Sequence, residues 1–136
     1  MSDGLILLLL IDAIMVGVIS SVQLVVYPGF AYYPPSDLKR WHDRYSGKIT
    51  LLVGPLMLGQ LAGAWYWVLT DAGWASSVYL AGILVLWGIT FFRFVPLHRK
   101  ISQGMADRNT LQRLVRENWS RTFLWILVFI WHLAFV

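Results

Sequence analysis

The stretch Phe94-Val95-Pro96-Leu97-His98-Arg99-Lys100 is followed, after a polar segment, by Leu114-Val115-Arg116-Glu117-Asn118-Trp119-Ser120-Arg121-Thr122. Charged side chains, aromatic rings and a proline meet here at a density found nowhere else in the chain. An apolar run that carries almost no charge lies on either side of this stretch. The structure that these apolar runs adopt therefore decides the fold.

Four apolar runs divide the 136 residues, at about residues 5–26, 49–69, 74–95 and 119–136. Each is close to the ~20 residues that a helix needs to cross a bilayer. The composition agrees, since 58% of the residues are hydrophobic and 13% are charged, against roughly a quarter charged in soluble domains. We therefore predict an all-α fold in which a single domain, residues 1–136, forms an integral membrane four-helix bundle. The first run has no basic segment before it, which predicts a retained span and not a signal peptide.

The basic residues predict the orientation of the bundle. All eleven lysines and arginines lie in or beside the first and third loops, at 39–48 and 93–121. The positive-inside rule places such loops in the cytoplasm. We therefore expect both termini on the outer, periplasmic side of a bacterial inner membrane.

The two cytoplasmic loops resemble each other. Val26-Tyr27-Pro28 closes the first run and Phe94-Val95-Pro96 closes the third, and a polar amphipathic stretch then leads into the next span. Prolines at these places predict helix ends at the membrane surface. Short helices would follow, with side-chain caps at Ser36 or Asp37 and at Asn109 or Thr110. The pattern predicts a parallel repeat of two helical hairpins about a pseudo-two-fold axis. The alternative is that any two membrane hairpins share prolines and polar stretches of this kind.

Several classes of function are excluded by what the chain lacks. It has no cysteine, which excludes disulfides, thiolate metal sites and iron–sulfur clusters. It has no glycine-rich phosphate loop and no zinc-type His/Cys spacing. The net charge of +4 does not indicate nucleic acid, because the basic residues follow the topology rule. The predicted partner is the lipid bilayer, with a homodimer or a larger membrane complex as further partners.

Polar side chains inside the spans are candidates for function, since burying them in a membrane is costly. Asp12 and His132 lie toward the outer side, where they would form an ion pair or a proton step. A second group lies toward the cytoplasmic side and is predicted to line a pocket capped by the two amphipathic loops. Its candidate catalytic residues are Gln23, His42, His98, Asn118 and Arg121. The alternative is structural, because arginines at a membrane surface commonly reach for lipid phosphates and a glutamine can bond a neighbouring helix.

His42 and His98 are expected to approach each other across the pseudo-axis. Two neutral imidazoles can bind a transition metal or haem iron, and one can pass protons to a quinone-like substrate. These histidines are therefore the candidate cofactor-binding residues, and haem or a transition metal is the candidate cofactor. The alternative is that both rings are solvated at the membrane surface.

Five motifs carry a resemblance to known proteins. They are Val22-Gln23-Leu24-Val25-Val26-Tyr27-Pro28-Gly29-Phe30, Trp41-His42-Asp43-Arg44-Tyr45, Ile49-Thr50-x-x-Val53-Gly54-Pro55-Leu56-Met57, Val95-Pro96-Leu97-His98 and Asn118-Trp119-x-Arg121-Thr122-x-Leu124-Trp125. On these motifs nearly the whole chain resembles an uncharacterised bacterial family of small four-helix membrane proteins, which is similar to the anthrone-oxygenase-like group. The resemblance implies the four-helix membrane fold and, from the fungal anthrone oxygenases, oxidation of a polycyclic phenol. The chain departs from the family pattern at Tyr45, near which a second histidine is common, and at Gln60, where an acid is common.

Three functions are compatible with these features. The first is a membrane oxidoreductase or oxygenase that acts on an apolar aromatic or quinone-like molecule. The second is a non-catalytic accessory subunit of a larger pigment or electron-transfer complex. The third is a dimeric transporter or channel that uses Asp12, Gln60 and His132 and dimerises through Gly59 and Gly63. No cofactor-specific motif is present, so the sequence leaves open whether the chain is an enzyme.

Overall fold

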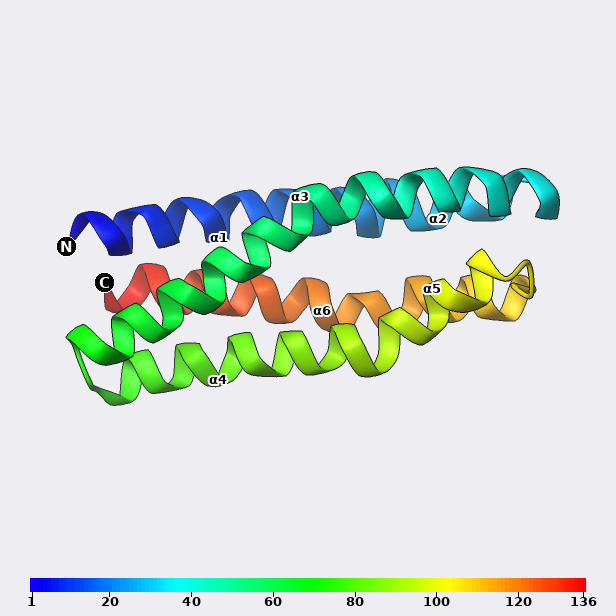
Figure 1. The fold of residues 1–136 in the computed structure, drawn as a ribbon. Helices are drawn as coiled ribbons and strands as arrows, with labels where there is room; N and C mark the ends of the chain where they lie inside the picture. The colour runs from blue at the N-terminus through cyan, green and yellow to red at the C-terminus, as the bar shows by residue number, and fades with distance from the viewer.

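The computed structural model describes all 136 residues as an all-helical bundle without strands (Figure 1). Four long helices follow one another, and two of them contain segments of π-helix or 3₁₀-helix. The elements are α1 (Asp3–Ser21), η1 (Val22–Val26), α2 (Tyr27–Gly29), η2 (Phe30–Tyr32), α3 (Pro35–Thr70), α4 (Trp74–Ile89), η3 (Thr90–Phe94), α5 (Val95–Ser102) and α6 (Arg108–Phe135).

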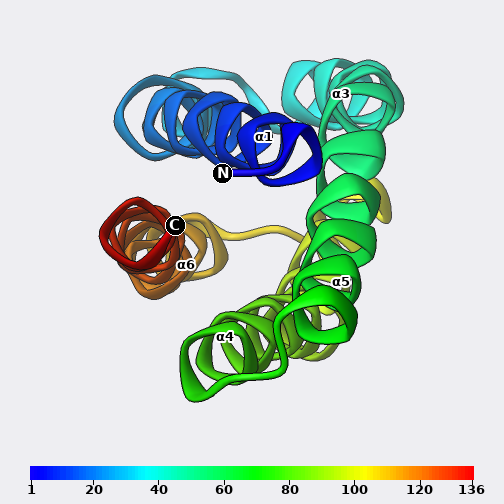
Figure 2. The same cartoon turned by 90° about the vertical axis from the view of Figure 1, so that its left-hand side faces the viewer.

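The four long helices form a ring in which each packs against two neighbours. α1 contacts α3 and α6, and α4 contacts the same two helices (Figure 2). Both chain termini lie at one end of the bundle, which we call the termini end (Figure 1). The two segments that hold all eleven basic residues, 39–48 and 93–121, lie toward the opposite end (Figure 1), which we call the basic end.

Three of the four long helices are long and apolar enough to cross a membrane: Asp3–Tyr32, Pro35–Thr70 and Trp74–Ser102. The prediction of an all-α bundle with helices able to cross a membrane is confirmed, but for three helices and not for the four that were predicted. α6 is not among the three, because Asn118, Arg121 and His132 interrupt its apolar sequence. All three of these side chains are buried inside the bundle.

The predicted helix ends at the basic end are wrong. The amphipathic stretches are not loops but continuations of the helices, so the chain turns only at residues 33–34 and 103–107. α3 alone has 36 residues, about 54 Å at 1.5 Å per residue, against a hydrocarbon core of ~30 Å. The helix is therefore longer than a bilayer core is thick.

Pro28 and Pro96 do not end their helices, contrary to expectation. A π-helical segment precedes each of them, and the residue just before the proline donates its N–H five residues back: Tyr27 to the Val22 carbonyl and Val95 to the Thr90 carbonyl. Proline normally breaks a helix because it lacks an N–H and its ring strikes the preceding turn. The wider π turn relieves both conflicts, and the helix continues.

The helix caps also differ from the prediction. α3 begins after Pro34, which offers no side-chain cap. α6 is capped by Asp107, whose Oδ1 accepts the backbone N–H and the hydroxyl of Thr110, each at 2.8 Å. These hydrogen bonds hold the pKa of the Asp107 carboxyl below its ordinary value, since they stabilise its charged form.

Gly59 and Gly63 form the face of α3 on which α1 packs. A Cβ at Gly63 would lie 2.5 Å from Leu8 Cδ1, and one at Gly59 would lie 3.0 Å from Ile11 Cδ1. The two glycines therefore allow the helices to approach closely. Because α1 of the same chain occupies this face, it is not free for the dimer that the transporter hypothesis required.

Candidate functional site

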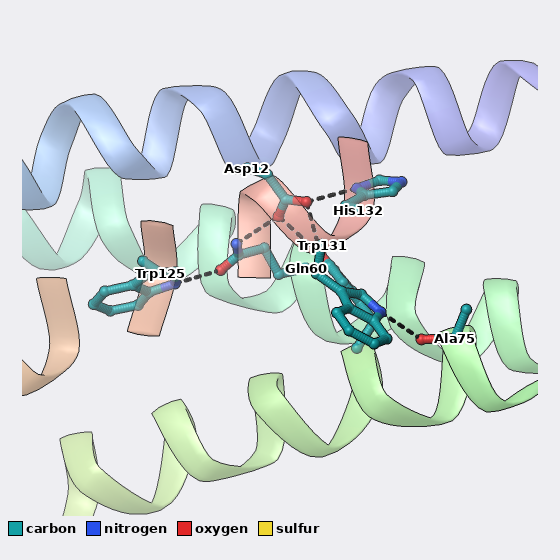
Figure 3. A network of polar contacts seen from close by, with 7 residues as sticks. Asp12, Gln60, Ala75, Trp125, Trp131 and His132 are labelled. Atoms are coloured by element: carbon teal, nitrogen blue, oxygen red, sulfur yellow. Dashed lines mark hydrogen bonds and ion pairs between the residues drawn. The ribbon is translucent and has the colours of Figure 1, made fainter. Parts of the chain in front are cut away.

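A buried carboxylate joins all four long helices (Figure 3). Asp12 of α1 accepts hydrogen bonds from Gln60 Nε2 of α3 at 2.7 Å and from the Tyr79 hydroxyl of α4 at 2.8 and 3.0 Å. Its Oδ2 lies 2.7 Å from His132 Nδ1 of α6. Gln60 passes the network on, because its Oε1 accepts the Trp125 Nε1–H at 3.0 Å. We call these five residues the Asp12 network.

Every side chain of the Asp12 network is at most 2% exposed. Asp12 and His132, which the sequence predicts to form an ion pair or a proton step, lie in direct contact. The sequence did not point to Tyr79, although a phenol within an apolar span is a polar group that needs a partner. Gln60 stands where the resemblance implies an acid. Both ends of its amide are hydrogen-bonded within the protein, so it does not face an open site.

The two predicted cofactor histidines lie together at the basic end. His42 Nε2 is 2.7 Å from His98 Nδ1. His98 Nε2 is 2.9 Å from the Tyr27 hydroxyl, and His42 Nδ1 is 3.2 Å from Ser102 Oγ. The result is a continuous hydrogen-bonded chain, Tyr27–His98–His42–Ser102, which we call the histidine relay.

The histidine relay can carry a proton. Each imidazole has one ring nitrogen that donates and one that accepts when neutral, so the chain can be written with its donors pointing either way. His42 is fully buried, whereas Ser102 is partly exposed at the end of α5. The relay therefore leads from the bundle interior to the surface of the basic end.

The donor set at the relay does not fit a metal or haem iron. All four imidazole nitrogens already lie within hydrogen-bond distance of another side chain. No group of three or more His, Cys, Asp or Glu side chains in the chain could hold a metal ion. The two imidazoles are instead hydrogen-bonded to each other.

A cavity of about 370 Å³ lies between the helices on the inner side of the relay. Most of its walls are apolar, and they include Met15, Met57, Trp87, Phe94 and Trp125. Its polar lining comes mainly from Tyr27, Tyr45, Ser46, Thr50, Thr90, His98 and Arg121, and it contains no acidic residue. We call this space the inner cavity.

The inner cavity opens toward the side of the bundle. Thr50 of α3, Phe91 of η3 and Val95 of α5 line it and are also exposed. Both π-helical segments contribute to its wall, with Val22 from η1 and Thr90 from η3. A molecule dissolved in the bilayer would therefore reach the cavity between α3 and the η3–α5 segment.

Three polar groups that line the inner cavity have a buried atom without a partner. They are Trp87 Nε1, Thr90 Oγ1 and Arg121 Nε. Buried polar atoms are nearly always hydrogen-bonded in proteins, so an unpartnered one needs an explanation. Three of the six such atoms in the protein therefore belong to residues that line this one cavity.

The five predicted catalytic residues separate into two groups. His98 and Arg121 line the inner cavity, and His42 lies behind His98. Gln23 and Asn118 do not line it. Asn118 Nδ2 donates to Gln23 Oε1 at 2.9 Å, and Gln23 Nε2 donates to the Val115 carbonyl at 3.1 Å. These two side chains tie the first helix to α6, which is the structural alternative for Gln23.

Comparison with protein-family models, curated proteins and solved structures found no match to this chain. The resemblance to the anthrone-oxygenase-like group therefore stays a prediction. What the protein does is inferred from the inner cavity, the histidine relay and the Asp12 network.

Replacing Asp12 with alanine is expected to lower the free energy of unfolding by about 3 kcal/mol, because it leaves the polar groups of three other helices without their acceptor. Tyr79→Phe removes one donor and should cost about 1 kcal/mol. Circular dichroism during denaturation in mild detergent measures both changes. Asp3→Ala removes an exposed acid from the same helix and is the control; equal stability of Asp12→Ala and Asp3→Ala would contradict a structural role for the network.

Proposed function

We propose that this chain is a small membrane oxidoreductase or oxygenase that binds an apolar aromatic or quinone-like molecule in the inner cavity. The observation that carries the proposal is the inner cavity itself. It has apolar walls, a few convergent polar groups and a volume of about 370 Å³, within the range typical of small-molecule sites. The same cavity begins a hydrogen-bonded path to the surface.

The polar groups suit a ring that bears oxygen. Trp87 Nε1–H can only donate a hydrogen bond, and the Thr90 hydroxyl can donate one. Both belong to the third long helix and both have an unpartnered atom. A carbonyl or phenol oxygen on an aromatic ring would satisfy them, while the ring itself packs against the apolar walls.

The histidine relay supplies a route for protons. When a hydroquinone is oxidised to a quinone by dioxygen, the substrate loses two electrons and two protons. Dioxygen takes up the two electrons and, with two protons from water, becomes hydrogen peroxide, so the protons of the substrate can leave by another route. His98, which lines the cavity, would accept the proton of a substrate hydroxyl, and His42 would pass it toward Ser102. Dioxygen is apolar and enters such a cavity from the bilayer.

Filling the inner cavity is expected to abolish ligand binding. Gly54 lines the cavity, and no atom lies within 4 Å of the position of an added Cβ, so Gly54→Leu places a side chain in the open space. The probe is 1,4-naphthoquinone, and its binding is measured by quenching of tryptophan fluorescence, since Trp87 and Trp125 line the cavity. The variant should bind at least about tenfold more weakly.

The matched control is Gly17→Leu, at an exposed glycine of α1 that also has free space for a Cβ. It should bind the probe as the wild type does. If neither 1,4-naphthoquinone nor its 2-hydroxy derivative binds the wild type, or if the probe binds Gly54→Leu as tightly as the wild type, the oxidoreductase proposal fails. An accessory subunit is then the next candidate, and co-purification with a larger membrane complex tests it.

Interrupting the histidine relay is expected to slow turnover without weakening binding. His42→Leu removes the link between His98 and Ser102, although His42 does not itself line the cavity. General acid–base groups contribute about 10²-fold or more to rate. Oxidation of naphthohydroquinone by dioxygen should slow by about that factor, with the dissociation constant unchanged. A rate equal to that of the wild type, after subtraction of the protein-free rate, would remove the relay from the mechanism.

We also propose that both termini lie on the outer side of the membrane and that the two halves of the chain form a parallel repeat. The first part rests on the position of all eleven basic residues and the positive-inside rule. The second rests on the matched π-helical segments. In each half, one residue separates the end of the π-helical segment from a proline. In this arrangement the relay opens to the cytoplasm.

The orientation can be tested with single cysteines, because the chain has none of its own. Ala72→Cys lies in the exposed turn at the termini end, and Gln103→Cys is exposed at the basic end. A membrane-impermeant maleimide should label the first in intact cells and the second only after the membrane is opened. The reverse labelling pattern would show that the termini face the cytoplasm.

A further inference from the structure

Arg121 is the most deeply buried basic side chain that lacks a counter-charge. It lies four turns into α6 and is 6% exposed. Its guanidinium carbon sits 4.2 Å from the centre of the Phe94 ring and 5.1 Å from that of Trp125. Its Nε has no hydrogen-bond partner, and no acidic side chain forms an ion pair with it.

The protein has no acid left to pair with Arg121. The sequence contains seven aspartates and glutamates, and none lines the inner cavity. Asp12 is held in its own network, and Glu117 pairs with Arg113 at 2.8 Å and with Arg93 at 3.5 Å. The side chain that hydrogen-bonds the guanidinium is Tyr27, and a phenol brings no counter-charge.

A buried cation without a neighbouring negative charge lacks the partner that would offset its burial. Cation–π contacts with Phe94 and Trp125 offset part of the cost of removing the guanidinium from water. They leave its Nε–H without an acceptor, and a planar guanidinium can hold two oxygens of an anion at once. Because Arg121 lines the inner cavity, an anion bound there would complete it.

We infer that the inner cavity selects an apolar aromatic anion, a ring system that carries an ionised hydroxyl or a carboxylate, and that Arg121 is the residue that recognises its charge. The inference rests on the proposed function, which requires only that an aromatic or quinone-like molecule occupies the cavity. It adds the charge of that molecule and the residue that reads it. The aromatic body would lie along Met15, Met57 and Trp87, with the anionic oxygen at Arg121.

Two naphthoquinones of nearly the same shape test the inference. 2-Hydroxy-1,4-naphthoquinone is ionised at neutral pH, whereas 1,4-naphthoquinone is neutral. The wild type should bind the hydroxyquinone at least about tenfold more tightly, and the preference should disappear when the pH falls below the pKa of the probe. 2-Naphthoate, as a third probe, distinguishes a carboxylate site from one for ionised hydroxyls.

Arg121→Gln should reduce the ratio of the two affinities to about one, and Arg121→Lys should keep part of it. Arg116→Gln changes an exposed arginine of the same helix that does not line the inner cavity, and it should leave the ratio unchanged. Equal binding of both quinones by the wild type overturns the inference and leaves the proposed function standing. Binding of neither quinone overturns both. The comparison on the wild type decides the matter even if Arg121→Gln does not fold.

Discussion

The carboxylate of Asp12 is the point on which the rest of the bundle depends. An acid in an apolar span needs partners within the protein, since the lipid around it offers none. Asp12 finds one partner on each of the other three long helices. Each of these bonds is short and directional, so together they set the rotation and the depth of α3, α4 and α6 relative to α1. Apolar packing alone would leave both more weakly specified, because lipid and leucine are equally apolar.

From this network, side-chain contacts continue toward the basic end. Gln60, held by Asp12, accepts the Trp125 indole, and Trp125 forms part of the cavity wall and of the aromatic surroundings of Arg121. The two π-helical segments widen the helices before Pro28 and Pro96, which lets both helices continue beyond those prolines. As a result Tyr27 and His98, on separate helices, meet at 2.9 Å above the cavity. An ordinary helix end at Pro96 would have turned the chain away before His98 could join the relay.

The buried polar groups of the interior fall into two sets by position. Gln23, Asn118 and Asp12 make hydrogen bonds between helices and hold them together. Trp87, Thr90 and Arg121 line the inner cavity, and each has a buried polar atom without a partner. In the sequence Gln23, Asn118 and Arg121 look alike, since each is a polar residue in or beside an apolar run. The expectation that Gln23 and Asn118 belong with Arg121 in one pocket was reasonable for this reason, and partnering across helices is what separated them.

The sequence by itself determined that the chain is helical, that it contains helices able to cross a membrane, and which polar residues lie within or beside those helices. Those properties depend on the cost of placing each residue in lipid, which adds up along the chain and needs no knowledge of its neighbours in space. The meeting of His42 with His98 and of Asp12 with His132 also followed from depth along the helices. Only the tertiary structure decided which polar group bonds which, that Tyr79 completes the Asp12 network, that helices pass through Pro28 and Pro96, and that Arg121 faces a cavity without a counter-charge. These features depend on how the helices are rotated and shifted against one another, and a change of one residue in register turns each side chain by about 100° around its helix.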